Sequence, residues 1–291
     1  MLVAVIDLDA ATVLAQWSVG GMLFGWVTTR HREVGLGYGW MLRITYALMA
    51  VGSVVAGRRY TPMGVRDVAV VLVAVGIVVA LASSVRRRAV GVRGFRAEHD
   101  RRTERVAAMT GIERVTSDDV AEGAEFNPWL DVAPVAVGAV ALVAAGVGAA
   151  DTGSSALVSV LRVLVGAAFL GAVTDAMLLG HWYLVQPGLP RRHLNELVRW
   201  LGWMWPLEVV ALCLPTGMFS VLSGTIDDGW GGTLGWFWVA CALTTIVLVR
   251  VTVAALAERQ YSAVMAATGL LYLAILTAFG TDLVARAVLA G

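Results

Sequence analysis

The sequence predicts an all-α fold, a polytopic membrane bundle of about eight transmembrane helices. Two observations lead to this prediction. Of the 291 residues, 58% are hydrophobic and 15% are charged, with a mean hydropathy of +0.76, whereas a soluble domain is about 25% charged. So few polar residues cannot coat a globule of this size, and lipid must therefore be the solvent for most of its surface. The second observation is a series of long apolar runs.

Each apolar run is long enough to cross a bilayer, which takes about 20 mostly apolar residues. The expected helices cover residues 11–28, 40–57, 67–85, 131–150, 156–186, 194–222, 232–256 and 261–285. This divides the chain into a three-helix part (1–85), a polar segment (86–130) and a five-helix part (131–291).

The orientation follows from the basic residues, because cytoplasmic loops of membrane proteins are enriched in them. The chain contains no Lys, and its Arg residues gather near Arg30, after Arg86, at Arg191 and at Arg259. We therefore expect these segments in the cytoplasm and both termini outside. The Arg-only, Val-, Ala- and Gly-rich composition is typical of a GC-rich bacterial genome, which predicts a multi-pass protein of a bacterial inner (plasma) membrane.

The polar segment 86–130 carries Arg in its first half and acids in its second. Its stretch RAEHDRRTERVAAMTGI predicts a short amphipathic helix on the inner membrane surface, where basic residues meet anionic headgroups. We interpret the segment mainly as a solvated connector that sets the topology. A docking site for a partner subunit is the alternative.

Residues 170–217 predict a hairpin of two spanning helices with ionisable residues inside apolar runs. At about 1.5 Å per residue, Asp175 and Glu208 lie roughly 18 and 21 Å from the inner ends of their helices, near mid-membrane. Bare carboxylates are costly there, so each must be protonated, paired or hydrated. Arg162 and Arg250 are candidate partners. A protonated carboxyl or a purely structural hydrogen bond between helices is the alternative to a proton-accessible site or a ligand contact.

His181 and Tyr183 lie nearer the inner interface than the two acids. His181 is suited to a packing hydrogen bond, a quinone carbonyl contact or a proton relay. A membrane haem commonly needs two facing histidines, and His31, His99 and His193 all fall in predicted cytoplasmic loops, which disfavours haem. The two cysteines have no CxxC spacing, so no metal site is predicted. Quinone and bound lipid remain the candidate ligands.

The sixth predicted helix contains Pro206 and Pro215, and a proline frees a backbone carbonyl one turn earlier. A helix broken at Pro206, beside Glu208, is how membrane proteins expose backbone at a midplane site. Trp205 belongs to a cluster that anchors the inner interface or, alternatively, forms the wall of a ligand site. In the last helix, Asp282 and Arg286 have the spacing of an i,i+4 ion pair.

No nucleotide, nucleophile-elbow or HExxH motif occurs, so an enzyme is disfavoured, although the question stays open. The first hypothesis is a non-catalytic subunit or accessory protein of a bioenergetic or redox membrane complex, which contacts quinone or lipid or assists proton movement. The alternative is a proton-coupled secondary transporter that uses the midplane acids, and an enzyme acting on lipid is a third. The expected partners are the bilayer and other membrane subunits, not nucleic acid. The candidate ligand or proton-pathway residues are Asp175, His181, Tyr183, Glu208 and Trp205.

Overall fold

The computed structural model describes residues 9–31, 33–88, 126–150, 153–186 and 189–290. In these ranges the chain is helical and contains no strand, which confirms the all-α prediction. The predicted amphipathic helix in 86–130 lies outside the described residues. The helices are α1 (Ala10–Thr29), α2 (Leu36–Tyr60), α3 (Gly64–Arg86), α5 (Pro128–Gly148), α6 (Gly153–Val185), α7 (Arg192–Cys213), α8 (Gly217–Leu222), α9 (Thr233–Ala257) and α10 (Tyr261–Leu289).

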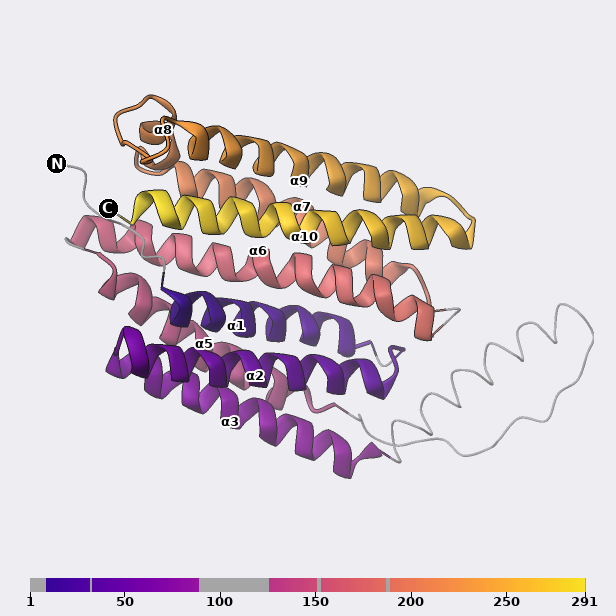
Figure 1. Ribbon diagram of the computed structural model, residues 1–291. Helices are drawn as coiled ribbons and strands as arrows, with labels where there is room; N and C mark the ends of the chain where they lie inside the picture. Colours follow the sequence, from indigo (N-terminus) through magenta and orange to yellow (C-terminus); the bar gives the residue numbers. More distant parts are fainter. Residues whose placement is uncertain (1–8, 32, 89–125, 151–152, 187–188, 291) are drawn as a thin grey trace, which may run out of the picture.

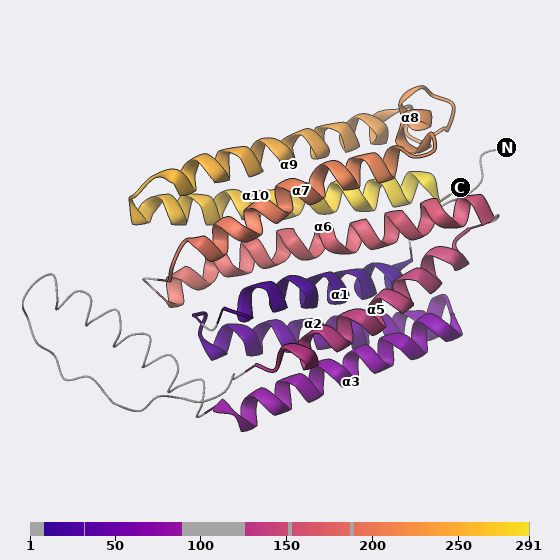
Figure 2. The ribbon, with the colours of Figure 1, turned by 180° about the vertical axis from the view of Figure 1, so that it is seen from behind.

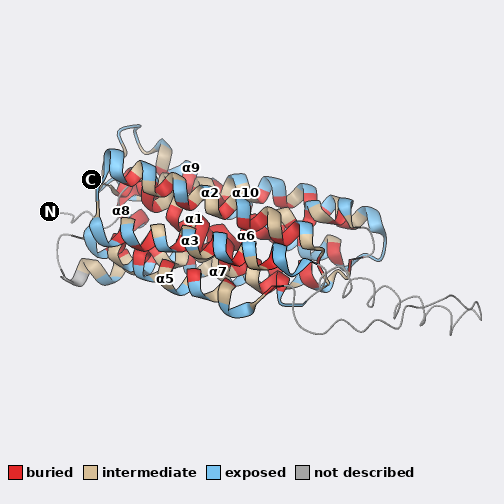
Figure 3. Cartoon of the chain, turned by 90° about the horizontal axis from the view of Figure 1, so that it is seen from below, coloured by how far each residue is buried: buried red, intermediate tan, exposed pale blue. Residues whose placement is uncertain are grey.

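Seven of the described helices are long and apolar enough to cross a membrane: α1, α2, α3, α5, α6, α9 and α10. Their outward faces carry large exposed apolar side chains such as Leu48, Val55 and Leu276. In Figure 3 the buried residues line the helix contacts and the exposed residues face outward. A bundle with an apolar exterior is stable only in lipid, so the chain is a multi-pass membrane protein.

The region predicted as one helix over 194–222 is two helices, and this expectation was wrong. The chain stays helical through Pro206 and leaves the helix after Cys213, so the break lies at Leu214–Thr216 and not beside Glu208. A single proline removes one backbone donor, and the neighbouring hydrogen bonds can still hold the helix. Helix α7 runs along the bundle with the seven apolar helices (Figures 1 and 2) and carries several charged residues, among them Arg192, Glu196 and Glu208.

Helices α1 and α6 form the centre of the bundle. Helix α1 packs against α2, α5 and α6, whereas α6 also contacts α7 and α10. Figure 1 shows α6 between the group α1, α2, α3 and α5 and the group α7, α9 and α10. The crossing of α1 and α6 is very close: a Cβ on Gly20 would lie 1.8 Å from the carbonyl oxygen of Ala167, and one on Gly171 would lie 2.2 Å from the backbone of Gly20. Only glycine permits this backbone contact.

The helix ends next to Arg30, Arg86, Arg191 and Arg259 lie at one end of the bundle (Figure 1), which we call the arginine-rich end. Arg191 donates hydrogen bonds to the backbone carbonyls of Arg259 and Gln260, at 2.8 and 2.7 Å, and so joins two of the loops at this end. Helix α1 begins and α10 ends at the opposite end (Figures 1 and 2). The chain therefore begins and ends its helical part at the same end, as expected when an even number of the described helices, the seven apolar helices and α7, run the length of the bundle.

Candidate functional site

Five buried polar side chains from four helices meet between α1, α6, α7 and α10. We call this group the buried polar cluster. Each member is at most 1% exposed although the surrounding helices are apolar, and ionisable groups in such a place are usually functional. The members are Gln16 of α1, Arg162 of α6, Glu208 of α7, and Asp282 and Arg286 of α10.

The α10 members form the predicted i,i+4 ion pair, in which Arg286 Nε donates to Asp282 Oδ2 at 2.8 Å. Gly166 of α6 makes room for this pair. A Cβ at Gly166 would lie 3.0 Å from Asp282 Oδ1 and 2.9 Å from Gln16 Nε2. Gln16 is oriented by a 2.7 Å hydrogen bond from Nε2 to the carbonyl oxygen of Val163. These contacts bring α1, α6 and α10 together at one point.

Arg162 connects the cluster to the end of α7. Its Nε donates to the carbonyl oxygen of Ala211 at 3.0 Å, and its Nη2 donates to the carbonyl of Leu214. Helix ends leave carbonyls without an intrahelical partner, and here a buried guanidinium supplies the missing donors. The chain then turns at Gly217, whose φ of 27° lies in the left-handed region and whose Cβ position is 2.8 Å from Arg162 Nη2.

Glu208 completes the cluster. Its carboxyl group lies within hydrogen-bonding reach of that of Asp282, a contact that requires a proton on one of the two, and it interacts electrostatically with Arg286 and Arg162. Among the described residues, twelve buried side-chain N or O atoms lack a hydrogen-bond partner, and seven of these belong to the buried polar cluster. They are Gln16 Oε1, Arg162 Nη1, both Glu208 oxygens, Asp282 Oδ1 and both Arg286 Nη atoms. Buried polar groups are normally satisfied, so this concentration indicates a place for a proton, water or a polar ligand.

Asp175 lies in a different environment. It accepts a hydrogen bond from the Tyr46 hydroxyl, and Tyr38 of the same helix, α2, donates to the Asp175 backbone carbonyl at 3.5 Å. Gly21 of α1 makes this possible, because a Cβ there would lie 2.0 Å from the Tyr46 ring. Asp175 therefore joins α2 to α6 across α1 and lies apart from the Glu208 cluster.

The ends of the helices also separate the two acids in depth. Asp175 lies about 15 Å from the arginine-rich end of α6, whereas Glu208 lies about 24 Å from that end of α7, at 1.5 Å per residue. Because α7 stops at Cys213, Glu208 is only about 8 Å from its other end. The expectation of one shared level placed the inner ends of the two helices near residues 187 and 194, whereas α6 ends at Val185 and α7 begins at Arg192. Arg162 is a partner of Glu208 as expected, and Arg250 is exposed on α9.

The three other predicted residues occupy three separate places. His181 is exposed, and its Nδ1 lies 3.2 Å from the hydroxyl of Tyr272 on α10. Tyr183 is buried and donates to the carbonyl oxygen of Pro190 at 2.7 Å, inside the α6–α7 turn. Trp205 Nε1 donates to the carbonyl oxygen of Ala242 at 2.9 Å and so joins α7 to α9.

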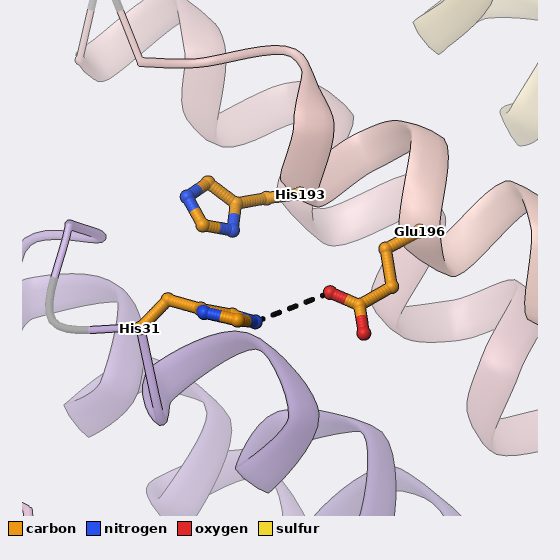
Figure 4. A group of neighbouring side chains, drawn as sticks. All are labelled: His31, His193 and Glu196. Carbon is orange, nitrogen blue, oxygen red and sulfur yellow. Dashed lines mark hydrogen bonds and ion pairs between the residues drawn. The ribbon is translucent and has the colours of Figure 1, made fainter.

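A second group of polar side chains lies at the arginine-rich end, where the α1–α2 loop meets the start of α7. We call it the histidine cluster (His31, Glu33, His193 and Glu196). Figure 4 shows His31, His193 and Glu196 facing one another. One possible ligand atom from each of these three lies within 4.8 Å of the others, so they could hold a metal ion. His31 Nε2 is 3.2 Å from Glu196 Oε2, and His193 Nε2 is 2.6 Å from Glu33 Oε2.

Sequence reasoning missed the histidine cluster because its two halves, residues 31–33 and 193–196, are about 160 residues apart in the chain. It placed His193 in a loop, whereas His193 lies in the first turn of α7 and is 1% exposed. It also treated Asp282 and Arg286 as a local pair without a link to Glu208. The sequence held a signal for both the histidine cluster and the link of Glu208 to Asp282 and Arg286. Polar residues near the same end of two neighbouring helices must lie at one depth in the membrane.

The comparisons with known proteins add no further assignment: no family model matches the chain, and neither a curated protein nor a solved structure matches it significantly. The fold and the two clusters therefore define the class, a multi-pass helical membrane protein with a charged, incompletely satisfied interior.

Proposed function

We propose that this protein is a proton-coupled secondary transporter of a bacterial inner membrane, with Glu208 and Asp282 as the proton-binding pair. The observation that carries the proposal is the set of seven unpartnered polar atoms of the buried polar cluster. A purely structural ion-pair network would be expected to satisfy these atoms, because each open donor or acceptor costs about 1–3 kcal/mol.

The charges of the cluster favour a small anion as the transported solute. With both acids ionised, the two arginines and two carboxylates sum to zero. The unpartnered guanidinium nitrogens of Arg162 and Arg286 supply donors for a carboxylate. An added anion leaves the buried group with one uncompensated negative charge, and a proton on Glu208 or Asp282 restores neutrality. Since uncompensated buried charge is costly, anion and proton would bind together.

The neighbourhood of Glu208 also favours an opening motion at this point. Helix α7 ends one turn beyond Glu208, and its last carbonyls are held by the Arg162 side chain in place of backbone. Interrupted helices beside a buried binding group are typical of secondary transporters. In this proposal the cluster, which is fully buried, corresponds to the occluded state of the transport cycle.

The test uses the full chain in proteoliposomes that contain a fluorescent pH indicator. Pyruvate, lactate and glutamate serve as probes, and internal acidification after their addition is compared with that of protein-free liposomes. We expect at least one probe to acidify the lumen faster with the wild type, and Glu208→Gln to abolish the difference. Glu258→Gln is the matched control, because Glu258 ends α9 outside the cluster. Equal rates for wild type and Glu208→Gln with every probe would overturn the proposal.

A second function is favoured by the His181–Tyr272 pair. These polar side chains contact each other on the outside of α6 and α10, where Tyr272 is 44% exposed among apolar residues. Two polar side chains on an otherwise apolar outer face can also contact a polar group from outside the chain. This favours a non-catalytic subunit of a respiratory or other redox complex that binds a quinone headgroup or a neighbouring helix here. Purification from native membranes with a photo-crosslinker at His181 tests this: a crosslinked subunit or co-purified quinone supports it, and crosslinks to phospholipid alone contradict it.

A further inference from the structure

The histidine cluster at the arginine-rich end has the geometry of a metal site, independent of the buried polar cluster. Its three converging residues, His31, His193 and Glu196, each offer one ligand atom within 4.8 Å of the other two. They come from two elements, the α1–α2 loop and the first turns of α7. We propose that these three side chains bind one Zn²⁺ ion, with a fourth position left to water or another small ligand.

The protonation pattern of His193 is the first observation that points to a metal. Its Nε2 is 2.6 Å from the Glu33 carboxylate, so this nitrogen carries the proton and donates it. Its Nδ1 then presents a lone pair, and that atom is buried without a hydrogen-bond partner among the described residues. The ring faces His31 and Glu196 (Figure 4). A lone pair aimed at another histidine and a carboxylate is what a cation requires.

The surrounding contacts match the outer sphere of a metal site. A metal-bound histidine usually donates its other N–H to a carboxylate, which orients the ring and makes the ligand nitrogen more basic. Glu33 has this role for His193, and it is itself paired with Arg192. Arg30 pairs with Glu196 Oε1, and its Nε lies 3.2 Å from His31 Nε2. Glu196 Oε2, the oxygen 3.2 Å from His31, is left for the ion, and Arg30 would have to turn away from His31 Nε2 when the ion binds.

The loop that carries His31 and Glu33 is held by Gln186, the residue that follows α6. Gln186 Oε1 accepts from the backbone N–H of Gly35 at 2.9 Å, and its Nε2 donates to the carbonyl oxygen of Glu33 at 2.9 Å. The ligands are therefore positioned before an ion binds. Two imidazoles and one carboxylate suit Zn²⁺ and exclude Mg²⁺ and Ca²⁺, which prefer all-oxygen sites.

The test measures Zn²⁺ binding to the full-length protein in detergent, purified without a histidine tag and treated with EDTA. Competition with a chromophoric chelator gives the affinity and stoichiometry, and Co²⁺ absorption reports on the coordination. We expect one Zn²⁺ per chain. His31→Ala and Glu196→Gln should each weaken binding by at least about 100-fold, and Glu33→Gln by about 10- to 100-fold through the orientation of His193.

His181→Ala is the matched control, a histidine removed from elsewhere in the chain, and it should bind as the wild type does. The side chain of His31 is 36% exposed, so the His31→Ala variant should keep the fold. Size-exclusion chromatography and circular dichroism can verify this. An ion-pair network without metal function is the competing outcome. The ion-pair network is established if the wild type fails to bind Zn²⁺, or if His31→Ala and Glu196→Gln bind Zn²⁺ as tightly as the wild type does. This conclusion does not depend on the result of the transport assay.

Discussion

Asp175 and Glu208 are both fully buried carboxyl groups in adjacent helices, yet their surroundings differ. Asp175 Oδ1 accepts a hydrogen bond from Tyr46, and another tyrosine, Tyr38, lies at its backbone carbonyl, whereas Oδ2 has no partner among the described residues. Glu208 faces a second carboxyl group, that of Asp282, within hydrogen-bonding reach, and lies beside two arginines. No N–H group or hydroxyl among the described residues donates to either Glu208 oxygen.

The difference shows that the neighbouring side chains determine what a buried carboxyl group can do. A neutral hydroxyl donor can hold a carboxyl group in a fixed position and joins two helices. A group of charged side chains with unpaired hydrogen-bonding atoms can gain or lose a proton or bind a ligand, because each charge added in a buried place must be balanced by another. Burial alone marks both residues, and the neighbouring side chains separate them.

The largest effect is expected when the charge balance of the buried polar cluster is broken. Arg286→Met leaves Asp282 without its ion-pair partner and Glu208 with one arginine fewer. Leaving a buried charge uncompensated costs about 3–5 kcal/mol, so we expect a large drop in the midpoint of thermal unfolding in detergent. Arg250→Met is the control: Arg250 is an exposed residue of α9, and little change is expected. Equal losses in the two variants would mean that the cluster is hydrated in the folded protein.

The tyrosine side of the comparison is tested by Tyr46→Phe. This substitution keeps the ring over Gly21 and removes the one side-chain donor that Asp175 has among the described residues. An unsatisfied buried group costs about 1–3 kcal/mol, so the protein should unfold at a lower temperature. It should still take up protons when pyruvate, lactate or glutamate is added to the proteoliposomes. Tyr272→Phe, at an exposed position, is the matched control. Loss of proton uptake in Tyr46→Phe would place Asp175 in the proton pathway and contradict the division between the two acids.

The sequence predicted the parts of the fold that depend on local composition. Seven of the eight helices expected from hydropathy are long apolar helices, and the eighth, over 194–222, is α7 and α8. The shared end of the arginine-rich loops follows from topology. The pair Asp282–Arg286 follows from helical spacing. The end of α7 could not be predicted in this way, because it depends on Arg162, a residue of another helix that binds the free carbonyls.

The candidate sites depend on contacts between distant segments, which periodicity does not encode. Glu208 was recognised because a carboxylate in an apolar run is rare, but its grouping with Asp282 required the packing of α7 against α6 and of α6 against α10. His31 and His193 look like ordinary loop residues until the α1–α2 loop lies on α7. The glycines that permit the close approach of α1 and α6 could not be singled out among 32 in the chain.

The smallest expected effect concerns Asp9, a carboxylate outside the membrane-spanning helices that contrasts with both buried acids. Asp9 caps α1 through the N–H groups of Ala11 and Thr12, accepts from Thr61 at 2.6 Å and pairs with Arg66 of α3. Burial alone would raise the pKa of Asp9, but the hydrogen bonds and the Arg66 guanidinium outweigh it and hold the pKa below the ordinary 3.8.

A carboxylate whose pKa is lower in the folded than in the unfolded protein stabilises the fold above its unfolded pKa, and this contribution is lost as the pH falls through the folded pKa. Asp9→Asn should therefore lower the unfolding midpoint at neutral pH, and its difference from wild type should shrink as the pH falls below 3.8. Asp227→Asn, which replaces an exposed acid beyond α8, is the control and should leave the unfolding midpoint at neutral pH close to that of the wild type. The difference in unfolding midpoint between Asp9→Asn and the wild type could instead stay constant as the pH falls. Asp9 would then stabilise α1 by its shape and hydrogen bonds and not by its charge, and it would no longer differ in this respect from Asp175, which is held by the Tyr46 hydroxyl.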